Sequence, residues 1–253
     1  MKIKLISDLH LEYEENKHFI AENLFSTNAD ILILAGDITY LERIENDYEK
    51  LFFKFLSDNF EKVFYLPGNT EFYGFTNLEN YSEQVYEALY DNFFLINNKS
   101  VKIGNIHFIF STLWTHIRQD KISFISKSIP DFQNINYKDT VFNPLINNEL
   151  NHKAINFIKQ ELRDEQRVKI VITHHAPSLH CANDEYDATS LYDAYYNDLD
   201  YLIQNNNIAY WLYGHTHFNK EILISDTIVI SNQIGLVKYK EHLNFNNNFI
   251  IEL

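Results

Sequence analysis

Cysteine and long apolar runs are scarce in this sequence of 253 residues. A single cysteine, Cys181, excludes an internal disulfide framework and favours a reducing compartment. No stretch approaches the roughly 18 to 20 apolar residues that a transmembrane helix needs. The first residues, MKIKLISDLHLEY, turn polar too early for the apolar core of a signal peptide. We therefore expect a cytoplasmic protein that does not enter a membrane.

Basic residues are also few. The chain has 21 Lys and Arg against 35 Asp and Glu, which gives a formal net charge of −14. Such a surface repels phosphate backbones and anionic lipids, so nucleic acid is an improbable partner. A phosphorylated substrate would need a local positive charge, which bound divalent metal ions could supply.

The composition is that of a globular protein. Apolar residues make up 45% of the chain and aromatic residues 15%, which makes disorder or a coiled coil improbable. The length suits one large domain with a proper core or two small ones, and we predict a single domain over residues 1–253.

Short apolar runs rich in β-branched residues alternate with longer amphipathic stretches. The runs predict buried strands at 3–7, 30–36, 62–68, 105–112, 168–174 and 208–215, with two further strands in the tail at 227–239 and 247–253. Apolar residues at three- and four-residue spacing predict helices near 41–60, 76–91, 149–165 and 191–206. Weak periodicity predicts long loops at 116–148 and 176–190. This order indicates a mixed α/β fold with helices outside the sheets.

The polar residues are placed where the predicted strands end. Five of these strands are each followed by His, Asp or Asn side chains, namely Asp8, His10, Asp37, Asn69, one of His174 and His175, His215 and His217. The carboxyl ends of strands in open α/β sheets form the crevice where ligands bind. A mixed oxygen and nitrogen set suits Zn, Mn, Fe or Co better than Ca. About seven ligands are too many for one tetrahedral ion. They suit two ions that share a bridging carboxylate.

These blocks resemble the calcineurin-like metallophosphoesterase superfamily. Its pattern is matched in order by DLH (8–10), GDI (36–38), GNTE (68–71), THHAPS (173–178) and GHTH (214–217). The resemblance implies a four-layer αββα sandwich with two mixed sheets and a dinuclear metal site at the strand carboxyl ends. It also implies which residues bind each ion: Asp8, His10 and His217 bind one, Asn69, His174 and His215 bind the other, and Asp37 bridges them.

The resemblance further implies the reaction. It is hydrolysis of small phosphodiesters or nucleotides by hydroxide formed between two divalent ions, with Mn, Fe, Zn or Ni as candidates. His174, the first His after its strand, is the expected ligand. His175 would then support that ligand or face the substrate, and it is grouped with Asn69 and Thr70 as a candidate catalytic residue.

One block departs from the pattern. The family usually has a His at the position of Thr70, where it assists the leaving oxygen as a general acid. A threonine hydroxyl carries no positive charge and gives up no proton near neutral pH. Three outcomes stay open: another group such as His116, His175 or His180 supplies the proton, the substrate has a good leaving group, or turnover is slow. The last outcome corresponds to an alternative function, a catalytically weak metal-binding scaffold that recruits a partner protein.

Overall fold

Two six-stranded sheets pack face to face in the computed structural model, which describes residues 1–23, 27–164, 167–183 and 191–253. The first sheet has the order β14 (Ile251–Glu252), β1 (Lys2–Ile6), β2 (Ile31–Ala35), β3 (Lys62–Leu66), β5 (Phe93–Asn97), β4 (Val85–Tyr90). The second has the order β12 (Glu221–Ile224), β13 (Thr227–Ser231), β11 (Ile208–Tyr213), β10 (Val168–Thr173), β7 (Ile106–Ser111), β6 (Lys99–Ile103). In each sheet the four central strands are parallel and both outer strands run antiparallel to their neighbours.

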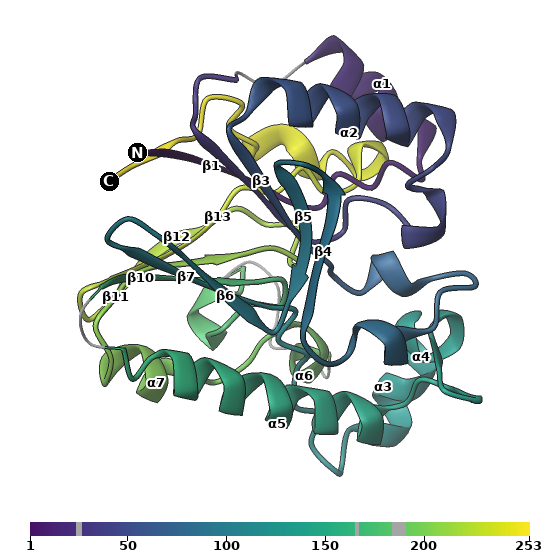
Figure 1. The fold of residues 1–253 in the computed structure, drawn as a ribbon. Helices are drawn as coiled ribbons and strands as arrows, with labels where there is room; N and C mark the ends of the chain where they lie inside the picture. Colours follow the sequence, from purple (N-terminus) through teal and green to yellow (C-terminus); the bar gives the residue numbers. More distant parts are fainter. Residues whose placement is uncertain (24–26, 165–166, 184–190) are drawn as a thin grey trace.

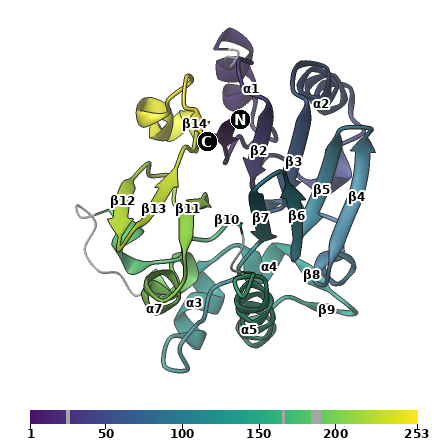
Figure 2. The ribbon, with the colours of Figure 1, turned by 60° about the vertical axis from the view of Figure 1, so that its left-hand side comes forward.

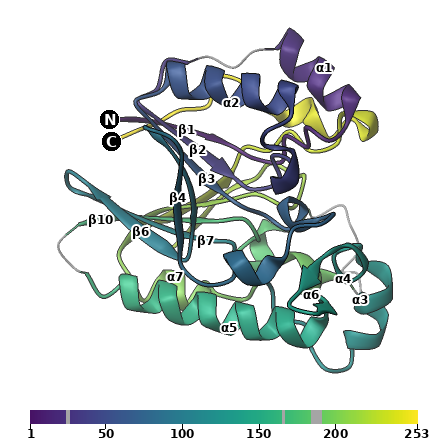
Figure 3. The same cartoon turned by 45° about the vertical axis from the view of Figure 1, so that its right-hand side comes forward.

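Helices cover the two outer faces of this pair of sheets, as Figures 1 and 3 show. The helices α1 (Glu14–Glu22) and α2 (Asp47–Asn59) lie over the first sheet. The helices α5 (Pro144–Glu161) and α7 (Asp200–Gln204) lie over the second, and Figure 2 shows these two on the same side of the molecule. Shorter elements connect them: α3 (Ile122–Ser128), α4 (Asp131–Asn134), α6 (Tyr192–Tyr195) and the hairpin β8 (Asn136–Tyr137) with β9 (Thr140–Val141). The predicted four-layer α/β fold with two mixed sheets is confirmed.

Alternation along the strands divides the core into three layers. In β2, Ile33 and Ala35 point between the sheets, whereas Leu32 and Leu34 pack toward the α1 and α2 side. Aliphatic and aromatic side chains fill the layer between the sheets, with Phe64 against Phe110 at a ring distance of 5.2 Å. Because both faces of β2 are buried, this strand is a continuous apolar run, as expected of a parallel sheet.

The prediction of a helix at 76–91 is wrong. A single turn of 3-10 helix (Leu78–Tyr81) is followed by β4, the antiparallel outer strand of the first sheet. The apolar spacing of Leu78, Tyr81, Val85 and Leu89 imitates a helix period. Pairing with β5 overrides it, since Val85 and Tyr86 fit a half-buried strand.

Other segments also differ from the prediction, among them the strands β5, β6 and β12, which were not predicted. The expected loop 116–148 contains α3, α4 and the β8–β9 hairpin, and the expected helix 191–206 is divided into α6 and α7. The expected helix 191–206 is interrupted because the backbone N–H of Asn197 donates to the carbonyl of Ala176. Between β13 and β14 the chain forms two short 3-10 helices, Val237–Tyr239 and Glu241–Asn244, where direct strand connections were expected. Of the expected loop 176–190, residues 184–190 lie outside the described residues.

Candidate metal centre

The predicted ligands leave their strands on an unusual backbone. Left-handed φ angles occur at five of them: Asp8 (56°), His10 (48°), Asp37 (55°), His215 (71°) and His217 (50°). This region is uncommon for residues other than glycine and costs about 1–3 kcal/mol when the surrounding structure imposes it. Such strain is concentrated at functional sites, where it holds side chains in a fixed direction.

Two glycines allow the strand-end loops to approach each other. A Cβ atom at Gly36 would lie 2.2 Å from Nδ1 of His174, and one at Gly68 would lie 2.3 Å from Oδ1 of Asp37. Side chains at these positions would displace the histidine or the carboxylate. The glycines before Asp37 and Asn69 therefore create the space in which the two sheets bring their polar residues together.

Four side chains form one half of the cluster. Asp8, His10, Asp37 and His217 each place a possible ligand atom within 4.8 Å of the others. Nε2 of His217 lies 3.0 Å from Nε2 of His10 and 3.4 Å from Oδ1 of Asp8. Asp8 is fully buried, and its carboxylate also accepts the His215 backbone N–H.

The other half shares Asp37. Asp37, His174 and His215 form a second group within the same 4.8 Å limit. Nε2 of His174 lies 3.0 Å from Oδ1 of Asn69 and 3.2 Å from Nδ1 of His215. The two oxygens of Asp37 face different halves: Oδ2 lies 3.8 Å from Nε2 of His10, and Oδ1 lies 3.4 Å from Nε2 of His174. Burial raises the pKa of Asp37 to about 6.

The far nitrogens of these histidines show which ring atoms carry protons. Nδ1 of His10 and Nδ1 of His217 lie 2.7 and 2.6 Å from carboxylate oxygens of Glu12 and Glu241. Nδ1 of His174 donates to the carbonyl of Ala35 (2.9 Å), and Nε2 of His215 faces that of Ala194 (3.4 Å). Each outer nitrogen therefore faces an oxygen acceptor and is the protonated one.

When the rings are neutral, the inward nitrogens are consequently acceptors, since they carry lone pairs directed at the cluster. The amide nitrogen of Asn69 donates to Asp131 (2.9 Å), which turns the Asn69 oxygen toward His174. Lone pairs and carboxylates that converge in a buried site need a cation. Burial opposes a charge on His217, but the carboxylates of Asp8 and Glu241 raise its pKa to about 10, so a proton is held there when no ion is bound. The donor set thus fits divalent metal ions.

His175 has a different environment from His174. It is 1% exposed, its Nδ1 donates to the carbonyl of Thr112 (3.1 Å), and burial lowers its pKa to about 3. Its ring packs on His215 at 4.1 Å and on Trp114 at 5.3 Å. This position supports the rings of neighbouring cluster residues.

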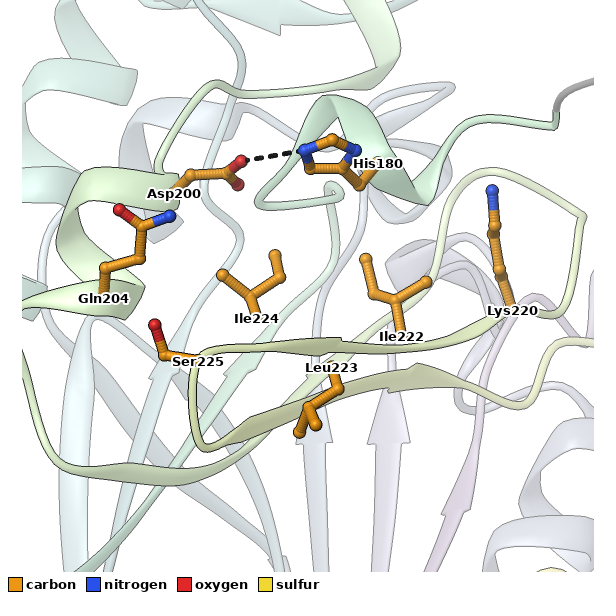
Figure 4. A pocket seen from close by; sticks show the side chains of 8 residues that line it. All are labelled: His180, Asp200, Gln204, Lys220, Ile222, Leu223, Ile224 and Ser225. Carbon is orange, nitrogen blue, oxygen red and sulfur yellow. Dashed lines mark ion pairs between the residues drawn. The ribbon is translucent and has the colours of Figure 1, made fainter.

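Two other residues considered from the sequence as proton donors are His116 and His180. His116 is exposed, and the neighbouring Arg118 pairs through Nε with Oδ2 of Asp193 at 2.8 Å. His180 pairs with Asp200 (3.3 Å) in a separate pocket of about 630 Å³, shown in Figure 4. That pocket lies between β12, α7 and the turn of His180, and no cluster residue lines it.

Several residues that shape the cluster were not predicted. Glu71 is fully buried and accepts the backbone N–H groups of Gly68, Asp37 and Ile38 (2.7, 2.9 and 2.7 Å), so it ties two strand-end loops together. Glu12 follows His10 by two residues, a spacing that could have indicated it. Asp131 and Glu241 come from distant segments with no local signal in the sequence.

Comparisons with known proteins point to one family. A family model described as calcineurin-like phosphoesterase matches residues 1–219. An uncharacterized protein of Acanthamoeba polyphaga mimivirus is 32% identical over 268 residues, which cover 96% of this chain and 94% of the relative.

Comparison with solved structures gives matches at low identity, and the first of them shares the fold. A phosphopantetheinyl hydrolase from Mycobacterium tuberculosis has a TM-score of 0.67 at 14% identity, covering 94% of this chain and 90% of that one. A dimetal phosphatase from Danio rerio has a TM-score of 0.46 at 11% identity, covering 92% of this chain and 87% of that one.

Among the described residues, no helix has both the length and the apolar character to cross a membrane.

Proposed function

Because this chain belongs to the calcineurin-like phosphoesterase family, we propose that it is a dinuclear metal-dependent enzyme that hydrolyses small phosphodiesters or nucleotides. The observation that carries the proposal is the convergence of acceptor atoms on both sides of Asp37. A carboxylate whose two oxygens face two separate ligand groups suits a pair of ions better than a single one.

The ligand assignment follows the two halves of the cluster. Asp8, His10 and His217 would hold one ion, Asn69, His174 and His215 would hold the other, and Asp37 would bridge them. Nitrogen and oxygen donors suit Mn, Fe, Zn or Ni, and we propose Mn as the first ion to test. The bound ions would activate a water molecule as nucleophile and stabilise the charge on the phosphoryl oxygens.

The remaining residues orient this centre. Glu12 and Glu241 fix the rings of His10 and His217, and Asp131 fixes the amide of Asn69. His175 packs against His215 and keeps its ring in place. With a pKa near 3, His175 is neutral at physiological pH and makes a poor general acid.

The substrate class follows from charge and from Thr70. A net charge of −14 disfavours polymeric nucleic acid and favours small substrates held by the ions themselves. Without the usual histidine, a leaving group that needs protonation loses a contribution of roughly 10²–10⁴-fold. We therefore propose phosphodiesters with good leaving groups as the best substrates. The single buried Cys181 supports action in the reducing cytoplasm.

The test is metal-dependent turnover on a defined panel. We expect the Mn-loaded protein to hydrolyse aryl phosphodiesters faster than phosphomonoesters or unactivated diesters. Asp37→Asn should lower kcat/KM at least about 100-fold, since it removes the bridge between the two ligand groups. The exposed Asp91→Asn serves as the control and should leave turnover unchanged.

The alternative function makes the opposite prediction. A metal-binding scaffold would take up two ions per chain and hydrolyse no member of the panel. That result would overturn the proposed enzyme activity and favour the scaffold, for which Thr70 in place of an acid is the supporting observation.

A further inference from the structure

Thr70 contacts the bridging carboxylate with two groups. Its hydroxyl Oγ1 lies 2.8 Å from Oδ2 of Asp37, and its backbone N–H donates to Oδ1 of the same carboxylate at 2.9 Å. Thr70 is only 6% exposed, and Asp37 is 3% exposed. The side chain at the position of the usual histidine therefore faces Asp37.

The direction of the hydroxyl bond follows from the chemistry of the pair. An ionised carboxylate has no proton to give, so the hydroxyl of Thr70 is the donor. A hydroxyl has one proton, and here it is directed at Oδ2 of Asp37. That proton is not available to a leaving group.

Both oxygens of Asp37 are thus fixed by one residue. Oδ2, which faces His10, accepts the hydroxyl, and Oδ1, which faces His174, accepts the N–H. The carboxylate cannot rotate about its Cβ–Cγ bond without losing one of these contacts. Glu71 fixes the backbone on either side, because it accepts N–H groups from Asp37 and from Gly68.

We propose that Thr70 is a positioning residue, which holds the Asp37 carboxylate in the orientation that bridges the two metal ions. This inference rests on the proposed function and deepens it. The usual histidine would act on the substrate, whereas Thr70 acts on the bridge. Loss of the Thr70 hydroxyl should weaken the binding of two metal ions, and this effect does not depend on any chemical step.

The experiment compares two variants with a matched control. Thr70→Val keeps the shape of the side chain and removes the hydroxyl, and Thr70→Ser keeps the hydroxyl. Thr39→Val is the control: Thr39 is also fully buried, two residues from Asp37, and its hydroxyl has no hydrogen-bond partner among the described residues. Mn²⁺ titration by calorimetry gives stoichiometry and affinity, and electron paramagnetic resonance detects an exchange-coupled Mn pair.

We expect Thr70→Val to weaken the second Mn²⁺ about 10–100-fold and to reduce the signal of the coupled pair, as is typical when a residue that orients a ligand is lost. Thr70→Ser should restore both, and Thr39→Val should match the wild type. If Thr70→Val does not fold, Thr70→Ala is measured against Thr70→Ser in its place. A hydroxyl-free variant with the affinity and coupled signal of the wild type would overturn the inference.

The outcomes separate this inference from the proposed function. If the wild-type protein binds two Mn²⁺ but hydrolyses no substrate, the proposed enzyme activity is overturned. The Mn²⁺ affinity of Thr70→Val still decides the role of Thr70. A wild-type protein that binds fewer than two ions overturns both.

Discussion

At the scale of single residues, the two halves of the candidate metal centre differ in the groups that accept a hydrogen bond from their histidines. Carboxylates of Glu12 and Glu241 accept from His10 and His217, whereas backbone carbonyls accept from His174 and His215. A carboxylate behind a histidine makes the ring a stronger donor to a cation. The half that contains Asp8 therefore has the more negative surroundings and should bind its ion more tightly.

Removal of one of these carboxylates should lower metal affinity without removing a ligand. We expect Glu241→Gln to weaken the tighter Mn²⁺ about 10–100-fold, because the amide orients His217 but supplies no charge. Calorimetric titration measures the change, with the exposed Glu87→Gln as control. Unchanged affinity in Glu241→Gln would show that the charge behind His217 has no role.

At the scale of elements, six of the strands were predictable because each is a short apolar run that ends in a polar turn, whereas β5, β6 and β12 were not predicted. The six buried strands begin and end within a residue or two of their predicted limits, as in β2 (Ile31–Ala35) for 30–36. The outer strand β4 could not be separated from a helix, since only its partner β5 distinguishes the two. The short 3-10 turns of the tail depend on contacts with distant segments, such as the bond from Val237 N–H to Oδ1 of Asn16.

The candidate site was predictable to a similar extent. Side chains that follow parallel strands meet at one edge, so Asp8 and Asp37 could be grouped from their positions alone. The structure brings the predicted residues together, and their roles as ligands stay predictions. Asp131 and Glu241 could not be predicted from the sequence, because long-range packing places them beside Asn69 and His217.

Helix α5 anchors the segment that leaves β7. Asn143 caps its N-terminus by accepting the backbone N–H groups of Leu145 and Ile146, and Pro144 occupies the first turn. The side chain of Asn147 donates to the carbonyl of Thr115 at 2.6 Å. The cap therefore stabilises both the helix and the loop of Thr115.

Loss of this cap should destabilise the fold measurably. We expect Asn143→Ala to lower the free energy of unfolding by about 1 kcal/mol, while Asn143→Asp retains most of it. Urea denaturation followed by circular dichroism measures both variants. Equal stability of the alanine and aspartate variants would mean that the cap contributes nothing.

At the scale of the whole molecule, the predicted ligands come from both sheets. Asp8, Asp37 and Asn69 follow strands of the first sheet, whereas His174 and the pair His215 and His217 follow strands of the second. Bound ions would link the two layers. The single domain predicted for 1–253 stays a prediction, although both sheets contribute to the same site.

Metal removal should therefore lower the stability of the whole protein. Each metal ion that binds only the folded chain adds about 2.7 kcal/mol to the free energy of unfolding when free metal is 100 times its dissociation constant. We expect a chelator to lower Tm by several degrees in differential scanning calorimetry, and added Mn²⁺ to restore it. Asp37→Asn should show a much smaller shift, and an equal shift in that variant would place the stabilising ion elsewhere.

The division of the ligands between the sheets also has a consequence for folding kinetics. Oδ1 of Asp8 and Nε2 of His217 lie 3.4 Å apart although 209 positions separate them in the chain. The two sheets must pack against each other before such distant groups meet, so the complete site forms late in folding. Metal ions would then leave the folding rate almost unchanged and slow unfolding, which makes the lifetime of the native state dependent on the metal supply.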